Sequence, residues 1–424
     1  MRAKELFQLF QKSTGVTIDS RSVQPGNIFF ALMGEHANGN AYAEIAIEKG
    51  ALCAVIDDVN YNINENFFLV DDSLTALQQL AKTYRDTLVI PFIAITGSNG
   101  KTTTKELMQA VLNKKYNAFA TKGNLNNHIG VPLSILSVMR QHTIAIIEMG
   151  ANHQKEIEFL CSLSNPTHAL ITNIGKAHLE GFGGPEGVKN GKSELYYYIM
   201  QNNGIVFANS GQEQLFDVYA KYDKVITYGF KENDFVNGKI ISSLPFATIK
   251  IDDFIIESNL VGQYNAENIL AAACAGKYFG IDLQEIKDAI ETYIPRNNRS
   301  EWKEINDNHF ILDAYNANPS SMKVAIENFM RLDVSPKIVI LGDMLEMGKY
   351  AAEEHTHILD TALSGNFNAI ITVGNEFEKA AAGKNIKAFK TNAAAKEYFN
   401  SQNYKGVYIL LKGSRGIALE KIIE

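Results

Sequence analysis

The sequence predicts an α/β protein of three domains. Short apolar runs that could each form a buried strand alternate with segments of helical spacing, which is typical of parallel sheets covered on both faces. This alternation begins near residue 89 and begins again after Pro295. At 424 residues the chain is also too long for one typical hydrophobic core. We therefore expect domains at residues 1–85, 86–296 and 297–424.

The first segment mixes short strands and helices, which predicts a small α/β domain. Residues 28–32 (IFFAL) and 53–56 are expected strands, and residues 42–49 are an expected helix that ends at Gly50. A second helix is expected over residues 76–84, where apolar side chains recur at helical spacing.

The central segment is expected to form a parallel sheet. Its strands are expected at the apolar runs 89–95, 144–147 and 169–174. Between residues 206 and 260 the strands are shorter and more polar, which indicates a small antiparallel excursion before a helix at residues 266–278.

The C-terminal segment is expected to form another doubly wound sheet. Strands are expected at residues 310–315, 337–341, 369–373 and 407–411, with a helix that begins at Ser321 between the first two. Four strands that alternate with helices make this second α/β sheet.

Composition and charge exclude several classes of protein. With 46% hydrophobic and 21% charged residues the chain matches an ordinary globular protein, and a net charge of −7 argues against broad nucleic-acid binding. Cys53, Cys161 and Cys274 have no metal-ligand spacing, which indicates a reduced, cytoplasmic protein. No apolar run approaches the ~20 residues of a membrane helix, and the N-terminus lacks the apolar segment of a signal peptide, so we expect no membrane insertion.

The stretch ITGSNGKTTTKE (residues 95–106) has the order of a phosphate-binding loop. Glycines permit a sharp turn and a close approach of backbone N–H groups, Lys101 can reach outer phosphates, and a threonine hydroxyl can ligate Mg²⁺. Ile95 stands where the usual motif has its first glycine, and a polar turn is the alternative. An expected strand before and an expected helix after favour the phosphate loop. The predicted nucleotide contacts are Gly97, Ser98, Asn99, Gly100, Lys101, Thr102 and Thr103.

Two further polar residues follow expected strands of the same sheet. Glu148 ends the run 144–147, and His178 comes shortly after the run 169–174. A residue of this kind is more often a cap or a core residue than a ligand. Because the carboxyl ends of parallel strands meet at one edge, their coincidence with the glycine loop favours phosphate and Mg²⁺ chemistry.

Four stretches together resemble the Mur ligase family: T-G-S-N-G-K-T-T, E-M-G-A-N, H-L-E-G-F-G and D-A-Y-N-A-N-P-S-S-M. The resemblance covers nearly the whole chain, and T-G-x-x-G-K-T is the family's own form of the loop. The loop alone would also fit folylpolyglutamate synthases. The resemblance implies a small N-terminal domain for a UDP-sugar-peptide, a central P-loop mononucleotide-binding domain for ATP and a C-terminal Rossmann-like ligase domain.

Within the family, the chain is most similar to the members that join D-alanyl-D-alanine to UDP-N-acetylmuramoyl-tripeptide. The resemblance implies that ATP phosphorylates the peptide carboxylate and that the amine of the dipeptide attacks the acyl phosphate. The product would be the pentapeptide precursor of peptidoglycan. Because two anions approach each other, cations have to neutralise them, and the implied cofactors are ATP and Mg²⁺. We expect a monomer.

By resemblance, Lys101 would hold the outer phosphates, and Thr102, Glu148 and His178 would bind metal ions. Lys192 falls where the family carries a carbamylated lysine, whose negative charge could bridge a second Mg²⁺. Without the resemblance, Lys192 is predicted to be an exposed helix lysine.

Three more residues match nucleotide contacts of the family. Asn268 would meet the adenine, although a helix cap is the alternative. Arg299 would lie near the nucleotide and Asp313 near its ribose. Tyr264 and Asn298 stand where the family has a histidine and a glycine.

The predicted substrate contacts lie in all three domains. Asparagine side chains offer donors and acceptors for peptide amides, and a Lys-Gly-Ser-Arg stretch could bind an anion, although an Asn-rich loop and a charged turn are the alternatives. The candidates are Ser20 and Arg21 for the uridine nucleotide, Asn124, Asn126 and Asn127 for the muramoyl-peptide, Asn316 and Asn318 for the dipeptide, and Lys412 and Arg415 for an anion.

Two alternative functions are weighed. A sibling ligase that adds a diamino acid would carry a D-N-P-R signature, and the sequence has none. A nucleotide-driven switch would need no ligand motifs on the outer domains, yet both carry them. His355 and His357 are not predicted to bind metal, because residues two apart on a helix point in different directions. The third residue of the peptide, meso-diaminopimelate or lysine, stays open.

Overall fold

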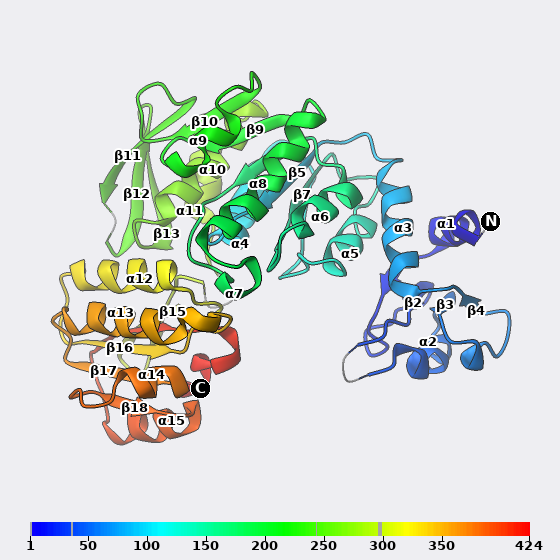
Figure 1. The fold of residues 1–424 in the computed structure, drawn as a ribbon. Helices are drawn as coiled ribbons and strands as arrows, with labels where there is room; N and C mark the ends of the chain where they lie inside the picture. Colours follow the sequence, from blue (N-terminus) through cyan, green and yellow to red (C-terminus); the bar gives the residue numbers. More distant parts are fainter. Residues whose placement is uncertain (1, 35–36, 243, 296–298) are drawn as a thin grey trace.

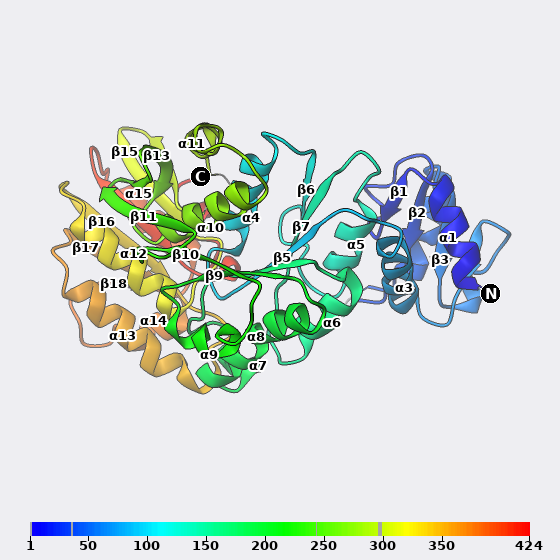
Figure 2. The ribbon, with the colours of Figure 1, turned by 90° about the horizontal axis from the view of Figure 1, so that it is seen from above.

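The computed structural model describes residues 2–34, 37–242, 244–295 and 299–424. The chain forms three sheets, each built from one continuous part of the sequence (Figure 1). In both views the first sheet lies at the right, and in Figure 1 the third sheet lies below the part of the second that runs from β11 (Val236–Ser242) to β13 (Phe254–Val261) (Figure 1, Figure 2). The predicted α/β fold of three domains is confirmed. Their boundaries stay predictions, and residues 296–298, with the Asn298 that replaces a family glycine, lie outside the described residues.

The N-terminal sheet has four parallel strands in the order β1-β2-β3-β4. β2 and β3 are buried on both faces and match the predicted runs, whereas β1 and β4 have three residues each and were not predicted. Helix α3 packs against α5 (Gly130–Leu136) and α6 (Glu156–Ser164) of the central domain, which joins the two domains. The elements are α1 (Arg2–Lys12), β1 (Gly15–Thr17), β2 (Asn27–Phe30), α2 (Ala43–Glu48), β3 (Cys53–Ile56), β4 (Phe67–Leu69) and α3 (Ser73–Arg85).

The central sheet has nine strands in the order β13-β12-β11-β10-β9-β8-β5-β7-β6. Strands β5 to β11 run parallel to their neighbours, and only the β11-β12-β13 pairs are antiparallel. The prediction of antiparallel strands is therefore wrong for β9 and β10, which are parallel. The sequence of so short a strand does not indicate its direction in the sheet. The strands are β5 (Phe92–Thr96), β6 (Ala118–Ala120), β7 (Ile144–Glu148), β8 (His168–Ile171), β9 (Ile205–Asn209), β10 (Val225–Gly229), β11 (Val236–Ser242), β12 (Phe246–Ile251) and β13 (Phe254–Val261).

Helices cover both faces of the central sheet and enclose two apolar layers. One layer contains α4, α10 and α11, and the other contains α5, α6 and α8. Because both faces are covered, the parallel strands are continuous apolar runs, as their sequences predicted. The helices are α4 (Lys101–Leu112), α5 (Gly130–Leu136), α6 (Glu156–Ser164), α7 (Leu179–Phe182), α8 (Pro185–Gln201), α9 (Phe216–Tyr219), α10 (Asn265–Tyr278) and α11 (Leu283–Thr292).

The C-terminal sheet has six strands in the order β14-β15-β19-β16-β17-β18. The four predicted strands are present, and the structure adds the antiparallel edge strand β14 and the short strand β18. β14 (EWKEI) is charged and partly exposed, so it has no apolar run to reveal it. The elements are β14 (Glu301–Ile305), β15 (Asn308–Asp313), α12 (Pro319–Arg331), β16 (Lys337–Gly342), α13 (Ala351–Leu363), β17 (Ala369–Val373), α14 (Asn375–Ala380), β18 (Lys387–Phe389), α15 (Asn392–Ser401) and β19 (Tyr408–Lys412).

The central and C-terminal domains contact each other through polar side chains. Asn318 Nδ2 donates to Asn99 Oδ1 at 2.7 Å, and Lys176 Nζ donates to Glu354 Oε1 at 2.5 Å. These contacts place the start of α12 directly beside the glycine loop. Among the described residues, no helix combines the length and apolar character needed to cross a membrane.

Candidate active site

The glycine loop joins the end of β5 to the start of α4. Gly97 has φ +144° and Gly100 has φ +78°, in the region that favours glycine. A Cβ on Gly97 would lie 2.0 Å from Thr172 Oγ1, and one on Gly100 would lie 2.5 Å from Asn268 Oδ1. Both positions therefore exclude a side chain, and the turn leaves the start of α4 open to an anion.

Gly97→Ala is expected to lower both the thermal stability and the affinity for an ATP analogue, since the new methyl group would collide with Thr172. Strain of this kind costs ~1–3 kcal/mol. Thermal melting and calorimetric titration would measure the two effects. Gly123→Ala is the matched control, because Gly123 also has positive φ, +55°, but has open space where a Cβ would lie. Equal effects of the two substitutions would contradict a role for the close contact at Gly97.

Lys101 is the first residue of α4, and its side chain folds back over the loop. Its Nζ donates to Gly97 O at 2.5 Å and to Ser98 O at 3.3 Å. Burial lowers the pKa of Lys101 to about 8, although the nearby Glu148 opposes this shift. A cation that contacts neutral carbonyl groups fits a site for a negatively charged ligand.

Glu148 lies at the carboxyl end of β7, beside the start of α4. Its Oε2 accepts a hydrogen bond from Thr102 Oγ1 at 2.9 Å, and its Oε1 accepts one from Asn126 Nδ2 at 2.8 Å. Lys105, which was not among the predicted site residues, has its Nζ 3.5 Å from Glu148 Oε2. A carboxylate beside a hydroxyl is a pair of hard oxygen ligands of the kind that Mg²⁺ binds.

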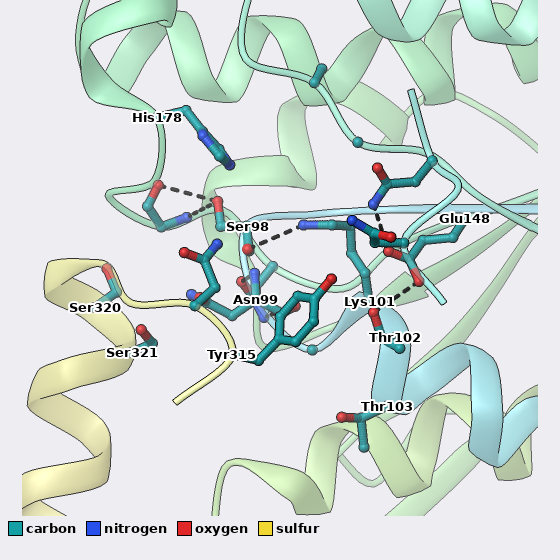
Figure 3. A pocket seen from close by; sticks show the side chains of 18 of the residues that line it. Ser98, Asn99, Lys101, Thr102, Thr103, Glu148, His178, Tyr315, Ser320 and Ser321 are labelled. Atoms are coloured by element: carbon teal, nitrogen blue, oxygen red, sulfur yellow. Dashed lines mark hydrogen bonds between the residues drawn. The ribbon is translucent and has the colours of Figure 1, made fainter. Parts of the chain in front are cut away.

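One cavity of about 960 Å³ brings most of the predicted site residues together. It lies between the central and C-terminal domains, and Figure 3 shows Lys101 and Glu148 of the first and Tyr315 of the second around it. The predicted residues that line it are Ser98, Asn99, Gly100, Lys101, Thr102, Thr103, Asn124, Asn126, Asn127, Glu148, His178, Asn268, Arg299, Asp313, Asn316 and Lys412.

Some predicted residues lie outside this cavity. Ser20 and Arg21 belong to the N-terminal domain, where the exposed Arg21 pairs with Asp19 at 2.8 Å. Arg415 pairs with Glu420 at 2.9 Å. These placements leave their proposed contacts with a uridine nucleotide and an anion as predictions.

Asn318 does not line the cavity and has two other partners. Its Oδ1 caps α12 by accepting from Ser321 N, and its Nδ2 contacts Asn99 of the glycine loop. In this arrangement Asn318 connects the two domains, and its contact with the dipeptide stays a prediction.

Lys192 is buried in the structure, whereas the sequence without the family resemblance predicts an exposed side chain. The prediction of an exposed helix lysine is wrong, since its side chain is 1% exposed. Its Nζ donates to Ala151 O at 3.0 Å and lies 5.1 Å from the centre of the Phe182 ring. Burial, together with the charge of Lys101, lowers the pKa of Lys192 well below its ordinary value.

Asn268 lies in the first turn of α10 and does not cap it, which removes the alternative role of a helix cap. Tyr264 precedes the helix, whereas Asn268 Oδ1 accepts from Thr104 Oγ1 at 3.1 Å and its Nδ2 donates to Asn265 Oδ1 at 2.8 Å. These bonds connect α10 to α4 next to Gly100. The side chain therefore lies at the part of the cavity that the glycine loop lines.

The C-terminal domain contributes a stacked cation and an ion pair to the cavity. The guanidinium of Arg299 lies 3.7 Å from the centre of the Tyr315 ring. Lys412 Nζ donates to Asp313 Oδ2 at 2.6 Å. Tyr315 was not predicted, although it stands inside the D-A-Y-N-A-N-P stretch that was singled out.

His178 contacts the C-terminal domain through a hydrogen bond between its Nδ1 and Glu346. This bond lowers the pKa of the Glu346 carboxyl. His355 is buried and accepts from Met344 N, whereas His357 is exposed, as expected for residues two apart on a helix. Asp343, at the end of β16, accepts from the N–H groups of α14.

Comparisons with known proteins match three successive parts of the chain to domains of one family. The Mur ligase middle domain matches residues 95–276, the Mur ligase, glutamate ligase domain matches residues 298–415, and the Mur ligase family, catalytic domain matches residues 12–85. The UDP-N-acetylmuramoyl-tripeptide–D-alanyl-D-alanine ligase of Bacillus subtilis is 35% identical over 97% of this chain and 92% of its own. The protein of the same name from Treponema pallidum is 32% identical over 96% and 92%.

Solved structures show the same similarity over the whole chain. MurF from Acinetobacter baumannii superposes with a TM-score of 0.88 at 29% identity, covering 99% of this chain and 97% of its own. MurF ligase from Thermotoga maritima in complex with ADP gives a TM-score of 0.83 at 25% identity, covering 98% and 96%. This chain therefore belongs to the Mur ligase family.

Proposed function

We propose that this protein joins D-alanyl-D-alanine to the C-terminal carboxylate of UDP-N-acetylmuramoyl-tripeptide while ATP is converted to ADP and phosphate. One observation carries the proposal: a single cavity is lined by the glycine loop, by Asn124, Asn126 and Asn127, and by strand ends of the C-terminal sheet. The names of the relatives support this assignment over the sibling ligase and the nucleotide switch. The proposed domains at residues 1–85, 86–296 and 297–424 would bind the UDP-sugar-peptide, ATP and the dipeptide.

The residues present fit ATP and Mg²⁺. Lys101 and the start of α4 offer positive charge and N–H donors to phosphate oxygens, and Arg299 offers a second cation at the same cavity. Thr102 and Glu148 would hold Mg²⁺, with His178 as a further predicted ligand. When bound, the metal would offset the charge of the transferring phosphate.

The chain would lower the barrier by position and charge. The peptide carboxylate and the terminal phosphate repel each other, and Lys101 between them would weaken this repulsion. Asn126 and Asn127 would orient the peptide, and Asn316 would hold the dipeptide near the acyl phosphate that forms. Lys412 would bind an anion. The contacts between the central and C-terminal domains would keep water from that intermediate.

The experiment is an assay of ADP release with UDP-N-acetylmuramoyl-tripeptide, with and without D-alanyl-D-alanine, and mass analysis of the product. Pentapeptide formation is expected only with all substrates present. Tripeptides that contain meso-diaminopimelate or lysine would be compared. A product formed from the dipeptide precursor and a diamino acid would favour the sibling ligase. ATP hydrolysis at a rate that does not depend on either substrate would favour a nucleotide switch.

We also propose that the protein works in the cytoplasm as a monomer. Its three cysteines are buried and unpaired, which fits a reducing compartment. Light scattering in solution would test the monomer.

A further inference from the structure

A lysine that the proposed mechanism does not use lies inside the protein beside the site. Lys105 follows Lys101 by one turn on α4, and its side chain is 2% exposed. Burying an ammonium group is unfavourable unless it is paired and hydrogen-bonded. Methionine would fill a similar volume without a charge, so packing alone does not require a lysine here. The contacts of the ammonium group therefore indicate the role of Lys105.

The ammonium of Lys105 lies between two parts of the cavity wall. Its Nζ donates to Gly123 O at 3.2 Å and lies 3.5 Å from Glu148 Oε2. Gly123 belongs to the asparagine segment, residues 121–127, which connects β6 to α5 and contributes Asn124, Asn126 and Asn127 to the cavity. Lys105 thus joins that segment to the carboxylate at the end of β7.

Further hydrogen bonds hold the two ends of the asparagine segment against β7. Near its start, Thr121 Oγ1 accepts from Glu148 N at 3.1 Å. Near its end, Asn126 O accepts from Gly150 N at 2.7 Å, and Asn126 Nδ2 donates to Glu148 Oε1. Residues 122–125 between these points are exposed, and Lys105 reaches the middle of them from inside.

We propose that Lys105 is a positioning residue that holds the asparagine segment in place beside Glu148, and thereby places the peptide carboxylate for reaction with ATP. The inference rests on the proposed function. It assigns Lys105 no contact with either substrate. Loss of the ammonium should therefore weaken binding of the peptide substrate and leave the glycine loop able to bind ATP.

Lys105→Met is expected to raise the KM for UDP-N-acetylmuramoyl-tripeptide about tenfold, because the hydrogen bond that is lost, from a charged donor to Gly123, lies on the peptide side. The KM for ATP should change less than about twofold, because Glu148 keeps its hydrogen bonds with Thr102 and Asn126. Lys114→Met is the control, because Lys114 is an exposed lysine in the turn just after α4. Equal increases in both KM values would overturn the proposal. Absence of ligation by the unmodified protein would overturn the proposed function instead.

Amide hydrogen exchange gives a readout that does not depend on activity. In Lys105→Met, exchange in residues 121–127 should become faster while exchange in α4 stays unchanged. Lys105→Gln retains a donor and should show intermediate exchange and an intermediate peptide KM. If Lys105→Met does not fold, Lys105→Gln can be used for both measurements. Unchanged exchange in the asparagine segment of a folded variant would overturn the proposal.

Discussion

Replacement of Lys101 by alanine is expected to abolish ligation, with a loss of at least about a thousandfold in turnover, while the protein stays folded. A thousandfold loss corresponds to ~4 kcal/mol of transition-state stabilisation, the size expected when a cation at a transferring phosphate is removed. Turnover and circular dichroism would be measured together. Lys114→Ala, in the exposed turn just after the same helix, should behave like the unmodified protein. Near-normal turnover of folded Lys101→Ala would exclude the phosphate-loop role.

The same lysine predicts how the reaction with ATP depends on pH. Burial lowers the pKa of Lys101 from 10.5 to about 8, so the group loses its positive charge as the pH rises through about 8. The kcat/KM for ATP, which reports the free enzyme, should therefore decline above that pH. Lys101→Arg would stay charged, and any remaining activity should lack this decline.

The elements of the fold that could be predicted are those whose position depends on one short stretch of sequence. β3 and β17 coincide with their apolar runs because both runs are continuous and are followed directly by polar residues or glycine. β14 and β18 were missed because an edge strand is exposed on one side and does not need an apolar sequence. The direction of β9 and β10 could not be predicted either, since it depends on which strand lies beside them.

The same distinction applies to the site. Gly97 and Gly100 were predicted from local chemistry, and the observed backbone angles require glycine at both positions. Lys105 was missed because its role depends on Gly123, on another element of the fold. The contact between His178 and Glu346 joins residues 168 positions apart. No pattern within one segment could reveal such a pair.

Burial changes the chemistry that is expected of Lys192. The sequence alone predicted a surface lysine, whereas the family resemblance predicted a carbamylated one. The structure buries its amine beside Ala151, which lines the cavity, and burial lowers its pKa well below the ordinary value. Only a neutral amine can attack carbon dioxide. The lowered pKa therefore favours the step in which the nitrogen forms a bond to that carbon and releases a proton.

Lys192→Ala is expected to reduce turnover severely, by about a hundredfold or more, if the carbamate holds a metal ion near Glu148. Such a loss equals ~2.7 kcal/mol of transition-state stabilisation. Acetate or formate at constant ionic strength should restore part of the rate, because a small carboxylate offers the same oxygens. Lys189→Ala, on the same helix but paired with Asp217 near the surface, should change stability by ~0.5 kcal/mol or less and leave turnover unchanged.

Carbon-13 NMR of the unmodified protein supplied with labelled bicarbonate would detect the carbamate directly. A carbamate resonance should be present in the unmodified protein and absent from Lys192→Ala, whose side chain has no nitrogen. Acidification should remove the resonance, because protonation of the nitrogen breaks its bond to the carboxyl carbon. Unimpaired turnover of Lys192→Ala, or no resonance in active protein, would contradict a carbamate at this position and leave Lys192 as a buried amine bonded to Ala151.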